Sequence, residues 1–193
     1  MRRNTPRFFL TIAGFAVAAI LLAAGGLLIW GSTYVHNTVH SQLAAQQIYF
    51  PPKGSPALAS PQIGPYLNQY AGQQLLTGQQ AEAYADHFIA VHVAETAGGK
   101  TYAQLSTAAQ AQPNNTKLAA QVNTVFKGES LRGMLLNAYG WWKVSQITYI
   151  ASIVSFALGG LALIGTTLGL AFGRKPQALP PITHESITPE TTA

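Results

Sequence analysis

Residues 8–30 read FFLTIAGFAVAAILLAAGGLLIW, a run of about 23 residues without a charged side chain. At about 1.5 Å per helical residue this run reaches about 34 Å, enough to cross a hydrocarbon core of about 30 Å. Residues 147–172 read ITYIASIVSFALGGLALIGTTLGLAF and form a second uncharged run of similar reach. Because backbone groups in lipid must be satisfied within their own segment, we expect both runs to be transmembrane helices.

The first run could instead belong to a cleaved signal peptide. Arg2 and Arg3 precede it, and the small residues 23–25 resemble a cleavage region. The apolar part of a signal peptide usually spans only about 7–15 residues, whereas this run continues through Leu27, Leu28 and Ile29. We therefore expect an uncleaved signal-anchor.

Composition points to the same class of protein. Hydrophobic residues make up 48% of the 193-residue chain and charged residues only 9%, against about 25% in ordinary soluble domains. The chain has no cysteine, which excludes disulfides and thiolate metal sites. The net charge of +5 comes largely from the flanks of the two runs, and residues 31–146 show no basic face. We therefore expect a lipid bilayer as partner and no nucleic acid.

The flanking charges predict the orientation of the spans. Arginines precede the first span within residues 1–7, and Arg174 and Lys175 follow the second. The positive-inside rule then places both termini in the cytoplasm of a multi-pass plasma-membrane protein. Trp30 ends the first span and Trp141-Trp142 precede the second, so all three tryptophans are expected at the opposite membrane surface. The tail, residues 173–193, has four prolines and no apolar period, and we expect it to be disordered.

The segment between the spans, residues 31–146, predicts a mainly helical extracytoplasmic domain. Apolar residues recur at helical spacing in residues 33–47, 79–96 and 116–144, with Gly128 as a candidate interruption. Thr77 and Gln80 fit a capping box, and Gly98 fits a helix end. A short helix is expected over 101–111, and the proline-rich residues 53–65 are expected to form an extended loop.

The fold class is thus an all-α membrane protein, with two transmembrane helices flanking this domain. Its expected core consists of the apolar residues on the inner helix faces: Val39, Leu43, Tyr84, Phe88, Val91, Leu118, Val122, Phe126, Leu131 and Leu135.

Small residues recur every four positions in the second span, at Gly165, Gly169 and Gly173. Such spacing lets helix backbones approach closely. Glycine is also common in membrane spans in general, so composition alone accounts for the pattern equally well. The alternatives are packing between the two spans and contact with a membrane partner, including a second copy of the chain.

Seven short stretches between the spans carry a resemblance to a family of actinobacterial two-span membrane proteins. They are Pro65-Tyr66-Leu67, Ala71-Gly72-Gln73-Gln74, Ala83-Tyr84-Ala85-Asp86, Ile89-Ala90-Val91-His92, Gly98-Gly99-Lys100-Thr101-Tyr102, Gly128-Glu129-Ser130-Leu131-Arg132-Gly133 and Leu136-Asn137-Ala138-Tyr139-Gly140-Trp141-Trp142. The resemblance implies the two-span layout and a compartment. Automatic labels sometimes call members of the family the small subunit of an aromatic ring-opening dioxygenase.

That label would require a non-haem iron site, usually two histidines and a carboxylate. His36 and His40 are four residues apart and would share a helix face, and His92 and Glu95 are three apart. A composite metal site of these four residues is conceivable if their helices meet. No recognised metal-ligand spacing is matched, however, so surface or interfacial histidines are the simpler interpretation. We therefore expect no catalytic residue, no cofactor and no metal.

Three functions are consistent with these features. The first is a non-enzymatic envelope protein that binds a partner or stabilises a membrane assembly. The second is an extracytoplasmic sensor that acts with a partner in trans, because the cytoplasmic tail is too short for an output module. The third is a metal-dependent, dioxygenase-like enzyme.

Overall fold

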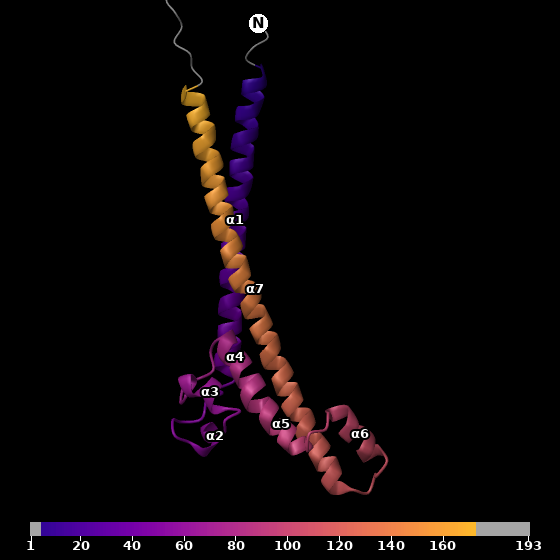
Figure 1. The fold of residues 1–193 in the computed structure, drawn as a ribbon. Coiled ribbons are helices and arrows are strands. Elements are labelled where there is room, and N and C mark those ends of the chain that lie inside the picture. The colour runs from indigo at the N-terminus through magenta and orange to yellow at the C-terminus, as the bar shows by residue number, and fades with distance from the viewer. Residues whose placement is uncertain (1–4, 173–193) are drawn as a thin grey trace, which may run out of the picture.

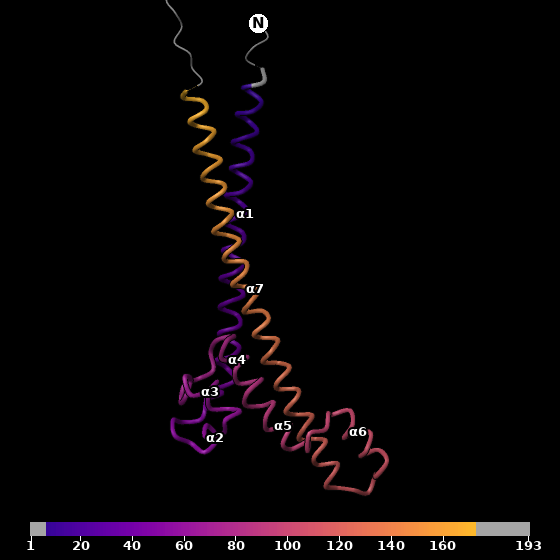
Figure 2. The backbone as a smooth tube through the Cα atoms, viewed as in Figure 1, coloured from indigo at the N-terminus to yellow at the C-terminus, as the bar shows by residue number. Residues whose placement is uncertain are grey.

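The computed structural model describes residues 5–172, with side chains from Arg7 onward, and these residues form a long helical hairpin with small helices at one end (Figure 1). Helix α1 (Thr5–Ala45, 41 residues) and helix α7 (Thr116–Phe172, 57 residues) are each continuous (Figure 2). At about 1.5 Å per residue α7 is about 86 Å long. Both helices are long and apolar enough to cross a membrane. In the most apolar stretch of each helix only 11% of α1 and 17% of α7 is buried. Within residues 5–172 no strand forms apart from one isolated bridge between Tyr49 and Gln74.

The two long helices run antiparallel, so the described ends of the chain lie together, away from the small helices (Figure 1). Their contact follows a seven-residue repeat of mostly small side chains. The buried positions of this repeat are Ala18, Gly25, Ser32 and Val39 on α1, and Ser145, Ser152 and Gly159 on α7. A seven-residue repeat keeps one seam facing the partner helix and produces a left-handed supercoil.

The small side chains let the helix backbones approach closely enough for side chain to backbone hydrogen bonds. The hydroxyl of Ser32 donates to the carbonyl oxygen of Ser145 at 2.8 Å, and the hydroxyl of Ser155 donates to that of Leu21 at 2.7 Å. A Cβ atom added at Gly25 would lie 3.1 Å from the Phe156 ring. The seam is therefore held by close packing and polar contacts, as in helix pairs that associate inside membranes.

The glycines at four-residue spacing do not take part in this seam. A Cβ atom at Gly165 or Gly169 would meet open space, and Gly173 lies outside the described residues. Packing between the spans through these glycines, one of the alternatives considered above, is therefore not what the structure shows.

The segment between the long helices forms six short helices and a π-helical turn. They are α2 (Pro56–Ala59), α3 (Gly64–Leu67), the 3-10 helix η1 (Asn68–Tyr70), α4 (Gly78–Tyr84), the π-helical turn η2 (Ala85–Ile89), α5 (Ala90–Ala97) and α6 (Tyr102–Gln110). Helices α2 and α3 lie beside the end of α1, α4 and α5 follow α7, and α6 lies near its far end (Figure 1).

The predicted helix ends are confirmed. Thr77 and Gln80 form the capping box of α4 through hydrogen bonds in both directions. Thr101 and Gln104 form a second capping box at α6. Gly98 ends α5 with a positive φ of 59°, a conformation that glycine adopts without a steric penalty.

The run from α4 to α5 packs antiparallel on α7 through two glycine contacts. A Cβ atom at Gly78 would collide with Trp142, and one at Gly128 would collide with Val93. Gly78 and Val93 are 15 residues apart, whereas Trp142 and Gly128 are only 14 apart. The π-helical turn η2 lies between the two contacts and accommodates the extra residue, so both contacts stay in register.

Several expectations for this domain need correction. Gly128 does not interrupt α7, because its missing side chain makes room for Val93. Phe126 was expected in the core but is 53% exposed, and its ring lies against that of Tyr102 on α6, with 5.6 Å between the ring centroids. Residues 53–65 contain helical turns at Pro56 and Gly64, each with proline in its first turn, rather than a wholly extended loop.

The remaining core predictions hold in part. Val39, Leu43 and Leu135 are buried, and the other predicted residues pack partly buried against the cluster. The buried residues absent from the expected core form two groups. One lies in the irregular segment: Phe50, Leu58, Ile63, Leu67 and Leu75. The other lies on the helices from α4 to α7: Ala81, Ala85, Ile89, Val93, Ala97, Leu105, Val125 and Trp142. Trp142 is 5% exposed and belongs to this core, in contrast to the surface role expected for it, whereas Trp30 and Trp141 are exposed.

Replacing Gly78 by alanine should destabilise the domain. The new methyl group would meet the Cβ and Cγ atoms of Trp142, which lie too close to the backbone of α7 to move away. We expect the free energy of unfolding to fall by about 1–3 kcal/mol, measured by tryptophan fluorescence during denaturant titration of the detergent-solubilised protein.

Gly140→Ala is the matched control, because a Cβ atom at Gly140 meets open space. Its stability should be unchanged or higher by up to about 1 kcal/mol, since alanine favours a helix over glycine. Equal loss of stability in both variants would show that the contact between α4 and α7 does not limit stability.

Candidate functional site

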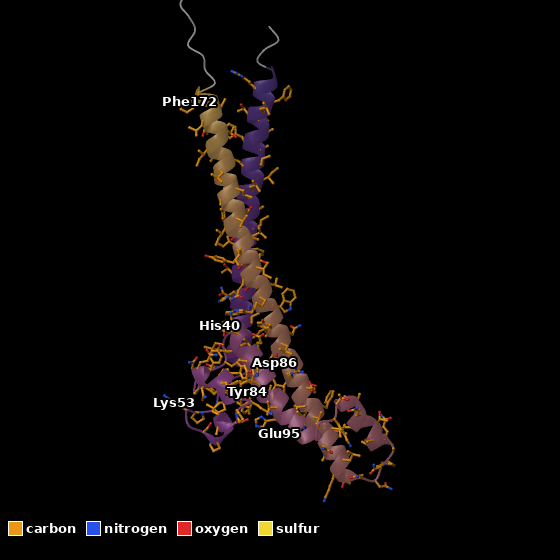
Figure 3. The ribbon with its side chains drawn as sticks, in the orientation of Figure 1. His40, Lys53, Tyr84, Asp86, Glu95 and Phe172 are labelled. Atoms are coloured by element: carbon orange, nitrogen blue, oxygen red, sulfur yellow. The ribbon has the colours of Figure 1, made fainter. Side chains whose placement is uncertain are left out.

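The four candidate metal ligands lie in different surroundings. His36 packs its imidazole against the Trp142 ring, with 4.0 Å between ring centroids. His40 is exposed on α1, and Glu95 lies well away from it on α5 (Figure 3). His92 lies over the Phe88 ring at 4.5 Å. Within residues 5–172 no group of three or more histidine, aspartate or glutamate side chains lies close enough to hold a metal ion.

A polar groove opens between α3 and α4, with a volume of about 390 Å³. The imidazole of His87 stacks on the ring of Tyr66, 3.5 Å apart and nearly parallel. Glu82 and Asp86, four residues apart, also line the groove. The histidine is thus held by an aromatic neighbour, and the carboxylates have partners on α7.

The carboxylates of the groove interact with α7. The guanidinium of Arg132 donates a 2.9 Å hydrogen bond to the carboxylate of Asp86 and lies 3.5 Å from that of Glu129. The hydrogen bond with Asp86 is the main cause that raises the pKa of Arg132. A hydrogen bond with the Glu82 carboxylate raises the pKa of Tyr139. These contacts attach η2 and α4 to α7, which is a structural role.

Asp86→Asn should weaken this attachment. The aspartate and arginine side chains are 37% and 33% exposed, so solvent screens the ion pair and we expect a loss of about 1 kcal/mol or less in the free energy of unfolding. High salt should reduce the difference from wild type. Glu95→Gln is the control, because Glu95 forms no ion pair within the described residues. A larger loss in the control than in Asp86→Asn would contradict the assignment.

The strongest candidate for a binding surface is the outer face of α7. It comprises Gly133, Met134, Asn137, Gly140, Trp141 and Val144, all exposed and none charged. Met134 is 64% exposed and Trp141 is 53% exposed. The face continues without a break into Ile147, which is 65% exposed and begins the apolar span. Exposed apolar surface of this kind marks interaction sites.

A groove of about 300 Å³, lined mostly by apolar side chains together with the amides of Gln42, Gln46 and Asn137, runs along one side of the outer face. Its floor comes from α7 through Leu131 and Ala138, and its opposite wall from the end of α1 through Val39 and Leu43. Met134, a flexible side chain that adapts to varied partners, lies at the rim. A groove of this composition suits an apolar side chain of another helix.

Sequence reasoning did not find this surface. The apolar residues of 116–144 form two stripes, one buried against the neighbouring helices and one exposed, and the expected core named residues of the buried stripe such as Leu131 and Leu135 without assigning a role to Met134 or Val144. The absence of charge at positions 133–142 was the available signal, because a solvated helix normally carries charges on its outer face.

Comparison with protein-family models, with curated proteins and with solved structures finds no match for the chain. The resemblance to the actinobacterial two-span family therefore stays a prediction.

Proposed function

We propose that this protein is a non-enzymatic interaction protein of the cell envelope, anchored in the plasma membrane by α1 and α7. The observation that carries the proposal is the outer face of α7, which is apolar, uncharged and exposed on both sides of the point where the span begins. A partner that covers it must contact the bilayer as well as the space outside it. The proposed partner is therefore another membrane-embedded helical protein, including a second copy of this chain.

Exposure of the spans supports the membrane location. Apolar side chains such as Leu27, Leu161 and Ile164 are 71%, 66% and 55% exposed on the isolated chain. In water this surface would be unfavourable by about 25 cal/mol per Å², whereas in lipid it carries no penalty. With both termini in the cytoplasm, as the flanking charges predict, the small helices stand outside the cell.

The glycine stripe gives the interaction a second contact inside the bilayer. Gly165 lies three seven-residue repeats after Val144 and therefore on the same face of the helix. A Cβ atom at Gly165 or Gly169 would meet open space in the single chain. The proposed contact thus extends from Met134 through Val144 to Gly165 and Gly169.

Single-cysteine cross-linking tests the proposal cleanly, because the natural chain has no cysteine. Val144→Cys places a thiol on the outer face of α7, and Glu95→Cys places one on α5, away from it. In native membranes we expect a short thiol-reactive cross-linker to trap Val144→Cys severalfold more than Glu95→Cys. A product of twice the chain mass identifies a second copy, and any other mass identifies a different partner.

Equal cross-linking of the two variants, or none for Val144→Cys, would contradict the proposal. Trp141→Ala in the Val144→Cys background should reduce the trapped fraction, because it removes the large exposed apolar ring on the same face of α7. Lys143→Ala is its matched control on the neighbouring position, since it removes a long side chain without altering the face.

A sensor acting with a partner in trans is the second candidate, and one observation favours it. Helix α7 joins the domain core at Val125 to the end of the second span at Phe172 without a break. A ligand that moved α5 against α7 would therefore act directly on the span. The cross-linking experiment separates the two, because a sensor should show a trapped fraction that changes with conditions outside the cell.

The orientation has its own test. In intact cells a membrane-impermeant maleimide should label Glu95→Cys, and it should label a cysteine in place of Thr5 only after the membrane is opened. Labelling of Glu95→Cys only in opened cells would place the small helices in the cytoplasm and overturn the assignment of the compartment.

A further inference from the structure

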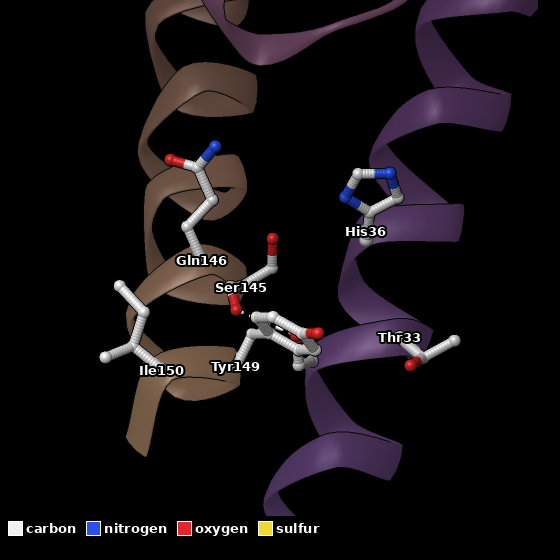
Figure 4. Close-up of a pocket in the computed structure, with 7 residues that line it drawn as sticks. Thr33, His36, Ser145, Gln146, Tyr149 and Ile150 are labelled. Carbon is white, nitrogen blue, oxygen red and sulfur yellow. Dashed lines mark hydrogen bonds between the residues drawn. The ribbon is translucent and has the colours of Figure 1, made fainter. Parts of the chain in front are cut away.

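A cleft of about 500 Å³ lies between α1 and α7, at the level where the apolar run of α1 ends and that of α7 begins (Figure 4). Its volume falls within the range of about 300–1,000 Å³ that is typical of small-molecule sites. The hydrogen bond from Ser32 to the carbonyl oxygen of Ser145 fixes the separation of the two helices there. The cleft is therefore built by the seven-residue seam and does not depend on loop conformation.

The cleft changes from polar to apolar along the helix axes. His36 and Gln146 lie toward the small helices, and Ile150 lies toward the span. Figure 4 shows the imidazole of His36 directed from α1 toward α7, and the ring of Tyr149 reaching across to the level of Thr33. A molecule that fits this gradient has hydrogen-bonding groups at one end and hydrocarbon at the other.

Three hydrogen-bonding groups line the cleft without a partner in the described chain. They are the imidazole of His36, the amide of Gln146 and the hydroxyl of Tyr149, none of which makes a side-chain hydrogen bond within residues 7–172. Each can donate to a phosphate or ester oxygen. No lysine, arginine, aspartate or glutamate lines the cleft, so recognition would depend on hydrogen bonds rather than on charge.

From these features we infer that the cleft binds one glycerophospholipid, with its phosphate and glycerol esters at His36, Gln146 and Tyr149 and the start of an acyl chain along Ile150. The inference rests on the proposed membrane insertion, because only then does the cleft lie at the level of the lipid headgroups. The exposed Trp30 and Trp141 flank this level on the two helices, where amphipathic rings favour the interface.

Retention of lipid by the purified full-length chain tests the inference. The protein is reconstituted in nanodiscs of phosphatidylethanolamine and phosphatidylglycerol, transferred to delipidating detergent, and examined by native mass spectrometry. We expect one phospholipid per chain to remain bound in the wild type. Because no charge lines the cleft, both lipids should be retained to a similar extent, and the retention should not fall in high salt.

Gln146→Ala and His36→Ala should each bind the lipid about tenfold more weakly, since a tenfold change corresponds to about 1.4 kcal/mol and so to about one net hydrogen bond. His40→Ala is the matched control: it removes an imidazole one helical turn further along α1, outside the cleft. Gln146→Ala is the more decisive of the two variants. It removes a hydrogen-bonding group from the cleft and leaves the packing contact between His36 and Trp142 intact, whereas His36→Ala removes that contact as well.

Equal retention in the wild type, Gln146→Ala and His36→Ala would overturn the inference. Displacement of the lipid by millimolar inorganic phosphate would show that the cleft recognises a free anion, which would overturn it as well. These outcomes differ from failure of the proposed function: a chain that does not enter nanodiscs refutes membrane insertion, whereas a chain that enters them without retaining lipid refutes only the cleft.

Discussion

The structure depends on one close contact, the approach of α1 to α7 along a seam of small side chains. Alanine, glycine and serine at seven-residue intervals remove the bulk that would otherwise separate the helices, and two serine hydroxyls then reach carbonyl oxygens of the opposite backbone. This contact sets the register of the hairpin. It thereby places Val39 and Leu43, at the end of α1, against the part of α7 on which the domain core assembles.

Local chemistry predicted the elements of the domain well, whereas the arrangement of the spans required the structure. Capping boxes and a helix-ending glycine act within a few residues, so Thr77 and Gly98 could be read from the sequence. Inside the spans nearly every residue is apolar, and hydrophobic periodicity carries no information there. Only the spacing of small residues distinguishes the face of each helix that contacts the other. In the second run the glycines repeat every four residues, whereas the contact follows the seven-residue series Ser145, Ser152 and Gly159.

The same limit applies to the functional surfaces. Of the histidines considered as candidate ligands, His36 packs against Trp142, which lies more than one hundred positions away in the sequence, and His92 lies over Phe88, one helical turn away. The cleft at Ser32 and Ser145 joins residues more than one hundred positions apart, and no local pattern points to it. The outer face of α7 could have been predicted in part. Residues 133–142 carry no charged side chain, and this lack of charge is visible in the sequence once the inner face of the helix is known.

The continuity of α7 restricts how the chain can change in length. Inserting one residue near Gly140 would rotate everything beyond it by about 100° and would separate the seam from the domain core, since each helical residue turns by that angle. An insertion between Pro51 and Ser55 would only lengthen a surface loop. The π-helical turn shows where one additional residue is tolerated without loss of registry, in the shorter helix that packs alongside. Length variation among related chains should therefore be concentrated in the loop and excluded from the stalk.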